Sequence, residues 1–344
     1  MAKRKTRRSG KRTALSVLCV FLGVVLAVML GGTVYFGQLY NKMNYVDPET
    51  QETISREEWE QMLSGETDPD ASGPAIDPDA AIDTEHDTQI GGKGSGIVNI
   101  LLIGQDRRPG EDRARSDSMI LCTFNKETGK LVMTSFLRDL WVEIPGYGNN
   151  RLNAAYSAGG MGLLDKTLQH NFGIRVDGNI EVDFTQFSRI IDLLGGVELE
   201  LRQDEANLIN GDCGSSLRAG LQTLNGAEAL SYARIRRLDA DSDLSRSNRQ
   251  RKVLTSLVVK FKDSDLNTML KLLDQVLPMV TTDMKQAEII GLATEVFPML
   301  MKLEMVSQRI PADGAYRFAT ISGMSVVQAD MDAARDLLEQ TLMN

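Results

Sequence analysis

Histidine is almost absent from this chain, which has only His86 and His170 in 344 residues. His86 lies in an acidic stretch without apolar periodicity, and His170 lies in an amphipathic segment that we expect to be helical. A Ser-His-Asp hydrolase needs a histidine base, and a histidine-ligated zinc enzyme needs several such side chains. The shortage of histidine therefore excludes both classes of enzyme.

Cysteine is also scarce, and its spacing fits no metal site. Cys19 lies in an apolar N-terminal run, Cys122 in a second apolar run and Cys213 in a Gly-Asp-Cys-Gly loop. A disulfide between Cys122 and Cys213 stays open, because sequence separation alone neither supports nor excludes it.

Charge is missing from one long run, Ala14 to Phe36, whereas residues 1–13 carry seven Lys or Arg side chains and no acid. At about 1.5 Å per residue this run spans a hydrocarbon core of roughly 30 Å, and the basic flank stays cytoplasmic. We predict a cytoplasmic tail (1–13), a transmembrane helix (14–36) and an extracellular remainder, which makes a single-pass protein of the cell membrane. A cleaved secretory signal is the alternative, but its apolar core is usually about 7 to 15 residues long.

Bases are nearly absent from Asn44 to Ile90, where Arg56 stands against fourteen acids. Such a composition cannot build a core and is typical of a self-repelling spacer. We predict that residues 37–95 form a mostly disordered acidic linker with a short helix at Ser55–Leu63. The glycine-rich run Gly91–Gly96 marks the predicted domain boundary.

No repeat or low-complexity break divides residues 96–344. Apolar runs predict strands at Ile97–Ile103, Ser118–Phe124 and Leu131–Phe136, the last two as a hairpin, and helices alternating with short strands follow. We predict an α/β fold, a three-layer α-β-α sandwich around a mixed central sheet, with residues 261–344 completing the core at 97–260. A small separate C-terminal domain is the alternative. The further predicted helices are Ala154–Ala158, Leu163–Asn171, Phe184–Leu194, Ala227–Ile235, Ser245–Lys260, Leu266–Leu277, Met284–Leu300 and Met331–Leu342, and the further strands are Asn179–Val182, Val197–Leu201, Glu304–Arg309 and Ala315–Thr320.

Six arginines fall between Arg234 and Arg251, in a chain that is otherwise acidic beyond its N-terminal tail. Guanidinium groups are permanently charged and bind two oxygens at once, so this concentration favours a phosphate ligand. Arg246, Arg249 and Gln250 share one face of a helix that we predict to begin at Ser245, where free N–H groups also attract anions. Arg234 and the nearby Arg236 can face one ligand only if the chain leaves helical geometry there.

Asp106 and Asp117 lie near the ends of predicted strands, with Arg115 beside Asp117 and the pair Arg138 and Asp139 ending the third strand. Loops at one edge of a sheet commonly build ligand sites, and two carboxylates with phosphate oxygens suit Mg²⁺. For isolated aspartates an exposed acidic turn is the alternative. Three further aspartates, Asp239, Asp241 and Asp243, lie in a charged loop, and one of them could take part in the site.

Seven sequence blocks resemble the LytR-CpsA-Psr family, and they occur in order behind the N-terminal anchor. They are Gly104-Gln105-Asp106 with Arg115-Ser116-Asp117, Ser135 to Asp139, Arg151 to Tyr156, Gly195-Gly196-Val197, Leu224-Asn225-Gly226, Ala229 to Arg236 and Arg246 to Gln250. Two positions depart from the family pattern, because Leu137 replaces a common proline and Arg151 stands where lysine is more usual.

The resemblance implies a Mg²⁺-dependent phosphotransferase, with Mn²⁺ as an alternative ion. Such an enzyme would move teichoic acid or capsular polysaccharide from an undecaprenyl-pyrophosphate carrier onto a peptidoglycan acceptor and would join the two by a phosphodiester. Asp106 and Asp117 would hold the ion, and Asp106, Arg138 and Asp243 would be catalytic, Asp243 as the base. The implied pyrophosphate-binding residues are Arg115, Arg138, Arg151, Arg234, Arg236, Arg246 and Gln250.

Two other functions remain open, a hydrolase of polyprenyl pyrophosphates and a non-enzymatic regulator of the cell envelope. A nucleic-acid partner conflicts with the predicted topology, which puts the arginines outside the cell. The lipid tail would need an apolar channel, and the apolar residues of the helices could either line one or form an ordinary core. The sequence carries no signal for the oligomeric state.

Overall fold

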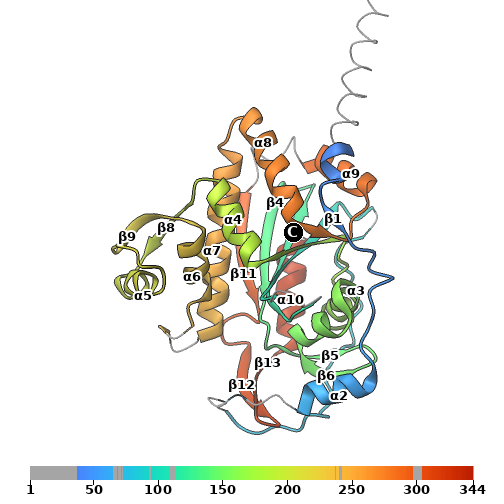
Figure 1. Cartoon of the computed structure of the whole chain (residues 1–344). Coiled ribbons are helices and arrows are strands. Elements are labelled where there is room, and N and C mark those ends of the chain that lie inside the picture. Colours follow the sequence, from blue (N-terminus) through green and yellow to red (C-terminus); the bar gives the residue numbers. More distant parts are fainter. Residues whose placement is uncertain are drawn as a thin grey trace, which may run out of the picture.

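The computed structural model describes residues 37–64, 68, 71, 73–92, 94–107, 113–236, 238–239, 242–296 and 304–343. The described chain is organised around a seven-stranded mixed sheet with the strand order β1-β10-β7-β2-β3-β4-β11 (Figure 1). The predicted tail and transmembrane helix at 1–36 lie outside the described residues. Within the described part, no helix is both long and apolar enough to cross a membrane.

The centre of the sheet is an antiparallel meander of β2 (Ile97–Gln105), β3 (Ser116–Asn125) and β4 (Lys130–Phe136), which confirms the three predicted strands and the hairpin. Two parallel neighbours make the sheet mixed, since β7 (Gly178–Asp183) pairs with β2 and β11 (Glu304–Ile310) pairs with β4. Because β11 comes from the C-terminal eighty residues, these residues complete the sheet and the alternative of a separate C-terminal domain is wrong.

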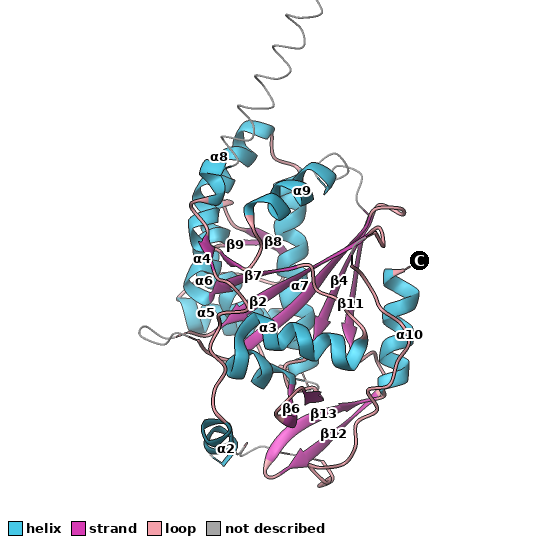
Figure 2. Ribbon diagram, turned by 90° about the vertical axis from the view of Figure 1, so that its right-hand side faces the viewer, coloured by secondary structure: helices cyan, strands magenta, loops and turns pink. Residues whose placement is uncertain are grey.

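Helices cover both faces of the sheet, as predicted (Figure 2). One face carries α3 (Leu152–Phe172) and α10 (Met331–Leu342), and the other carries α4 (Phe184–Leu193), α7 (Ser242–Lys262) and α8 (Leu266–Val276). The short α9 (Gln286–Val296) follows β10 (Thr281–Thr282).

Helix α3 was predicted as two helices, and the structure shows why the pattern breaks. Gly159 and Gly160 have non-helical backbone angles, with φ 64° at Gly160, a conformation that a residue without Cβ adopts at little cost. The two predicted helices therefore exist as two helical segments, 152–158 and 161–172, which meet at this kink.

A satellite unit lies beside α7 and was only partly predicted (Figure 1). The predicted strand β8 (Val197–Leu201) pairs with β9 (Gly220–Leu224) in a separate hairpin, not with the central sheet. With α5 (Gln203–Cys213) and α6 (Gly226–Arg234) it encloses its own apolar cluster. Helix α5 was missed because it carries little apolar periodicity. Cys122 on β3 and Cys213 at the end of α5 are both free thiols.

Two further hairpins lie near the edge where β4 and β11 end. They are β5 (Trp141–Ile144) with β6 (Gly148–Arg151), and β12 (Tyr316–Ile321) with β13 (Met324–Ala329). The sequence predicted β12 but not the other three, of which β5 and β6 have only four residues each.

The prediction of a mostly disordered linker at 37–95 is wrong for the residues that the structure describes. The predicted short helix exists as α2 (Arg56–Ser64), and β1 (Asn44–Tyr45) joins the central sheet by pairing with β10. Trp59 is 1% exposed and its ring centroid lies 4.9 Å from that of Tyr147. A few widely spaced apolar residues thus attach an acidic segment to the domain surface. The average composition of the segment does not reveal this attachment.

Candidate functional site

A β-bulge brings the two predicted metal-binding aspartates to the same edge of the sheet. Gly104 pairs with Ser118 but Gln105 pairs with Ser116, so Asp117 is an extra residue in β3. Bulges re-aim side chains and are common beside active sites. Asp106 directly follows β2, so both carboxylates lie within two residues of the bulge.

Three predicted phosphate-binding arginines gather around Asp117 and Asp139. Arg138 donates from Nη1 to Asp117 Oδ1 at 2.7 Å and from Nε to Asp139 Oδ2 at 3.2 Å. Arg151 Nη1 lies 3.4 Å from Asp139 Oδ1. Burial, followed by the positive charges of Arg151 and Arg138, lowers the pKa of Arg115. The three guanidiniums therefore lie close enough to repel one another, and a bound anion would relieve that repulsion.

Arg234, the last residue of α6, brings a further cation to Asp106. Its Nη2 lies 3.8 Å from Asp106 Oδ2, and its Cζ lies 4.9 Å from the ring centroid of Phe184. Ile235 leaves helical geometry with φ −58° and ψ 124°. This is the departure that the sequence required if Arg234 and Arg236 were to face one ligand.

The Leu-Asn-Gly block fixes the residue at which α6 begins, and Arg234 is the last residue of this helix. Asn225 forms a capping box with Glu228, and the Gly226 N–H donates to Asp192 Oδ1 at 2.7 Å. A Cβ at Gly226 would lie only 2.1 Å from the carbonyl oxygen of Ser188 on α4. Glycine is needed here because two helices approach closely.

Helix α7 begins at Ser242, three residues earlier than predicted, so Arg246 belongs to its second turn. Arg246 is 5% exposed, and Gln250, one turn further on, lines an apolar cavity together with Arg234. The side chain of Asp243 lies outside the described part of the structure, so its role as a base stays a prediction.

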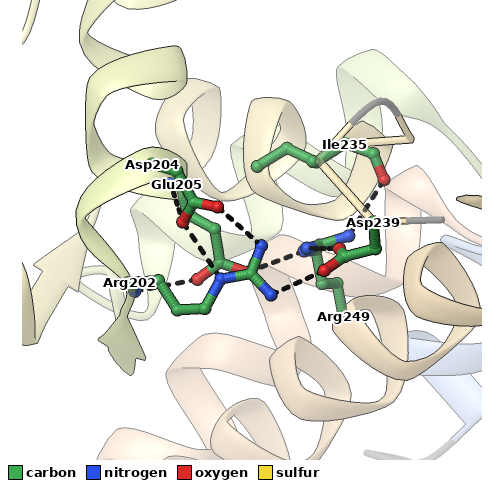
Figure 3. Close-up of polar contacts among 6 residues, drawn as sticks. All are labelled: Arg202, Asp204, Glu205, Ile235, Asp239 and Arg249. Atoms are coloured by element: carbon green, nitrogen blue, oxygen red, sulfur yellow. Dashed lines mark hydrogen bonds and ion pairs between the residues drawn. The ribbon is translucent and has the colours of Figure 1, made fainter.

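The contacts of Arg249 correct the prediction that it points to one ligand together with Arg246 and Gln250, because its guanidinium is bound to the residues drawn in Figure 3. It donates to Glu205 Oε1 at 2.8 Å and to the carbonyl oxygen of Ile235 at 3.2 Å, and it is ion-paired with Asp239. Arg202 also pairs with Asp239, at 2.7 Å. Helical spacing could not reveal this, because the partners lie on α5 and in the loop before α7.

Two adjoining apolar cavities, of about 360 and 580 Å³, lie between the sheet and helices α4, α7 and α8. Arg234 and Gln250 line the smaller cavity beside Gly104 and Ser118, at the edge that carries the arginines. The structure thus joins a cationic site to an apolar space, a choice that the sequence left open. Six residues line both cavities, namely Met43, Ile180, Ile190, Leu257, Val276 and Leu277.

The sequence model of the LytR_cpsA_psr family matches residues 45–341. The chain belongs to this family. The match confirms the predicted resemblance, and it includes most of the acidic segment that the sequence assigned to a linker.

Among relatives in the family, MsrR of Staphylococcus aureus, named a regulatory protein, is 39% identical over 167 residues, which are 48% of this chain and 49% of MsrR. The chain thus spans about half the length of the MsrR proteins that it matches. TagT of Bacillus subtilis, named a polyisoprenyl-teichoic acid–peptidoglycan teichoic acid transferase, is 31% identical over 76% of each chain.

Solved structures of the family share the fold. A structure of TagT bound to LI-WTA is 30% identical with a TM-score of 0.59, over 72% of this chain and 92% of that one. A structure of YwtF (TagT) with bound octaprenyl pyrophosphate lipid is 27% identical with a TM-score of 0.57, over 74% and 94%.

The family blocks also contain a buried polar network that the sequence analysis did not assign. Gln105 accepts from the Ala114 N–H at 3.0 Å and donates to Glu181, which also accepts from Tyr156. Burial and then the charge of Glu181 raise the pKa of Tyr156. Gln105 thereby ties together the two ends of the loop that carries Asp106 and Arg115. Glu181 belongs to no block, so only the fold reveals it.

Proposed function

We propose that this chain is a phosphotransferase that moves an anionic glycopolymer from a polyprenyl-pyrophosphate carrier onto peptidoglycan through a phosphodiester. The observation that carries the proposal is the arginine site at one end of the apolar cavities. The name of TagT as a teichoic acid transferase and the octaprenyl pyrophosphate bound to YwtF support it.

The donor is an amphiphile, and both of its parts have a counterpart in the site. The cavities would take the polyprenyl tail, since each buried CH₂ contributes about 0.8 kcal/mol. The pyrophosphate would lie among the guanidiniums, where bidentate hydrogen bonds to oxygen are strongest. Arg234 and Gln250 line the boundary between these two environments.

In the proposed reaction an acceptor hydroxyl oxygen forms a bond to the phosphorus that bears the polymer. The bridging P–O bond to the carrier breaks, and polyprenyl phosphate leaves. The hydroxyl proton goes to a base, for which Asp243 is the proposed residue. Negative charge grows on the bridging and leaving oxygens, and preorganised cations such as Arg138 and Arg246 stabilise it. No histidine is required.

We propose that Asp106 and Asp117 hold Mg²⁺, or Mn²⁺ in its place. No group of three or more His, Cys, Asp or Glu side chains suited to a metal occurs among the described residues. Two carboxylates still fit, because protein-bound Mg²⁺ commonly takes one or two carboxylates and completes its shell with substrate phosphates and water. When bound, the ion would neutralise charge on the pyrophosphate oxygens.

We further propose that residues 14–36 anchor the protein in the cell membrane, with the N-terminus in the cytoplasm and the domain outside. The carrier lipid would then be presented at the same membrane surface. Protease digestion of the domain on intact cells is the expected result, and protection of the domain would contradict this topology.

The transfer proposal is tested with the full-length protein in detergent, isotope-labelled polymer on its carrier, and peptidoglycan fragments. Label bound to peptidoglycan is the expected product. Label released into solution would instead indicate a hydrolase. Label that stays on the carrier would favour a regulator without enzymatic activity, in line with the name of MsrR.

A further inference from the structure

One arginine of the sequence cluster has no role in the site described above. Arg251 on α7 is 5% exposed and donates from Nε to Ser307 Oγ at 2.8 Å and from Nη1 to Ser247 Oγ at 3.3 Å. Both partners are neutral hydroxyls. Among the residues that the structure describes, no carboxylate forms an ion pair with Arg251.

A second arginine lies on the same face of the sheet. Arg309 on β11 pairs with Ser135 on β4, which pairs with Ile120 on β3, so the three side chains form one row. Ile120 lines the smaller cavity together with Gln250 of α7, and α7 contacts β3, β4 and β11, so the row lies beneath α7. Ser307 lies two residues before Arg309, on the same face of β11, and Arg251 reaches it from α7.

Two buried hydrogen-bond donors in this row are unsatisfied within the described part of the chain. The Nε atom of Arg309 and the hydroxyl of Ser135 are buried and have no hydrogen-bond partner in the described part of the chain. Arg309 does form an ion pair with Asp313, but that carboxylate side chain is 89% exposed. The cluster therefore combines two guanidiniums and three hydroxyls with only one peripheral carboxylate.

The cluster is electrostatically unfavourable as it stands. Burial, followed by the charge of Arg309, lowers the pKa of Arg251 to about 10. A buried cation is costly unless a counter-charge and hydrogen bonds compensate it. The hydroxyls of Ser135 and Ser307 can turn to donate to an oxyanion beside the two guanidiniums, whereas the Ser247 hydroxyl already donates to the carbonyl oxygen of Leu244 at 3.1 Å.

We propose that Arg251, Arg309 and Ser135, with Ser247 and Ser307, form a second anion-binding site for an oxyanion of the phosphate class. The site lies between α7 and the edge strand β11, where Ser307 is exposed and leaves a route for the ligand. It adjoins the arginine site, since Ser135 precedes Arg138 by three residues and Ser247 follows Arg246. Two sources share this chemistry, free phosphate and a phosphodiester of an anionic polymer. The inference does not depend on the proposed transferase function.

The test is thermal unfolding of the full chain with and without inorganic phosphate at constant ionic strength. All variants carry Arg234→Ala, so that the first site contributes less. Phosphate should raise Tm, because a ligand that binds only the folded state stabilises it. Arg251→Gln should weaken phosphate binding about 10- to 100-fold, the value of hydrogen bonds to a charged group.

The decisive signature is opposite behaviour in the two buffers. Without phosphate, Arg251→Gln should raise Tm because it removes a buried charge, and with phosphate it should remove most of the protection. A variant that lowers Tm equally in both buffers would show that Arg251 is only structural and would overturn the proposal, as would the absence of any phosphate effect before the substitution.

Two further variants guard against misfolding as an explanation. Ser135→Ala should leave Tm without phosphate unchanged and still weaken phosphate binding, and unchanged binding would count against the site. Arg317→Gln is the matched control, because Arg317 lies on β12 and its described hydrogen bond is to Gln328. Its phosphate response should stay normal.

A short glycerol phosphate oligomer separates the two sources of the anion. Binding of the oligomer that is tighter than that of phosphate and is lost in Arg251→Gln assigns the site to a polymer phosphodiester. Equal, Arg251-dependent binding of both assigns it to free phosphate. Binding of both that is independent of Arg251 overturns the proposal.

Discussion

The two faces of the central sheet use alternating residues of the same strands, yet one face is filled and the other is hollow. On β2, Leu101 packs into the main apolar core beneath α3, whereas Leu102 lines the smaller cavity beneath α7. On β3, Leu121 and Cys122 divide in the same way. The strand residues that point to either face are apolar in the sequence. Side chains of this chain fill the space above only one of the two faces.

The difference fits the proposal that the apolar surface under α4, α7 and α8 receives the polyprenyl tail of the donor. Interiors are normally close-packed, and apolar cavities of this size forgo the dispersion contacts that a filled core gains. Apolar spaces of this kind favour apolar ligands. The comparison between the packed and the hollow face can be tested in five ways.

The largest expected effect is on stability. Leu101→Ala should lower the free energy of unfolding by about 2–5 kcal/mol, the usual cost of a cavity in a packed core. Leu102→Ala on the same strand should cost clearly less, because its side chain already borders the smaller cavity and its removal creates little new enclosed space. Chemical denaturation measures both, and equal losses would show that the two faces are packed alike.

The next effect concerns the polar end of the hollow face. Arg138→Ala and Arg246→Ala should each reduce transfer by about 10²- to 10³-fold, or about 2–4 kcal/mol of transition-state stabilisation. Single-turnover transfer of labelled polymer measures this, with Arg317→Gln as the control. Near-normal rates in both alanine variants would remove these arginines from the chemistry.

Metal dependence gives a smaller effect at the same edge. Asp106→Ala and Asp117→Ala should each require a roughly tenfold higher Mg²⁺ concentration for half-maximal transfer, since each would remove one carboxylate ligand. Asp332→Ala is the control, because its exposed carboxylate on α10 pairs with Arg335, outside both proposed sites. Superimposable Mg²⁺ titrations for all three proteins would contradict the proposed ligands.

A titrating group on the packed face should make stability depend on pH. Burial raises the pKa of Asp165 on α3 to about 8, and Asn179 donates to its Oδ2 at 2.9 Å. A raised pKa favours the folded state at low pH, and that contribution is lost as pH rises from about 4 through 8. Asp165→Asn should therefore stabilise the protein at pH 8 by at least about 1 kcal/mol and flatten the dependence of Tm on pH. An unchanged profile would contradict the assignment.

The smallest effect is a change of reactivity on the hollow face. Burial raises the pKa of Cys122 to about 12, so little thiolate exists at pH 8. Alkylation of Cys122 should be slow there and rise about tenfold per pH unit up to pH 10, because the thiolate fraction rises by that factor. A polyprenyl phosphate should protect Cys122 but not Cys213 in the satellite unit. Mass spectrometry of the labelled peptides separates the two thiols.

Much of the fold could be predicted, because regular patterns survive in the sequence. Strands β2, β3 and β4 contain runs of mainly apolar residues, and α4 and α10 have clear helical periodicity. The failures have local causes. The short β5 and β6 carry too few residues for a pattern, and α5 carries little periodicity. The acidic segment before residue 96 is attached by isolated residues such as Trp59.

The candidate site was predicted as a set of residues but not as an arrangement. Arg138, Arg234 and Gln250 meet at one edge as expected, whereas Arg249 joins the α5–α6 unit and Arg251 turns toward β11. All of these side chains look alike in the sequence. Their roles differ because carboxylates and hydroxyls from distant elements reach some of them and not others.

The sequence by itself determined the family, the apolar strands, the concentration of arginine and the absence of histidine chemistry, because composition and local periodicity are properties of the chain. Only the tertiary structure decided which guanidiniums face a ligand and which sheet face stays hollow. Those choices depend on contacts between residues far apart in sequence, such as Arg249 with Glu205 and Arg251 with Ser307, and on the space that α4, α7 and α8 leave above the sheet.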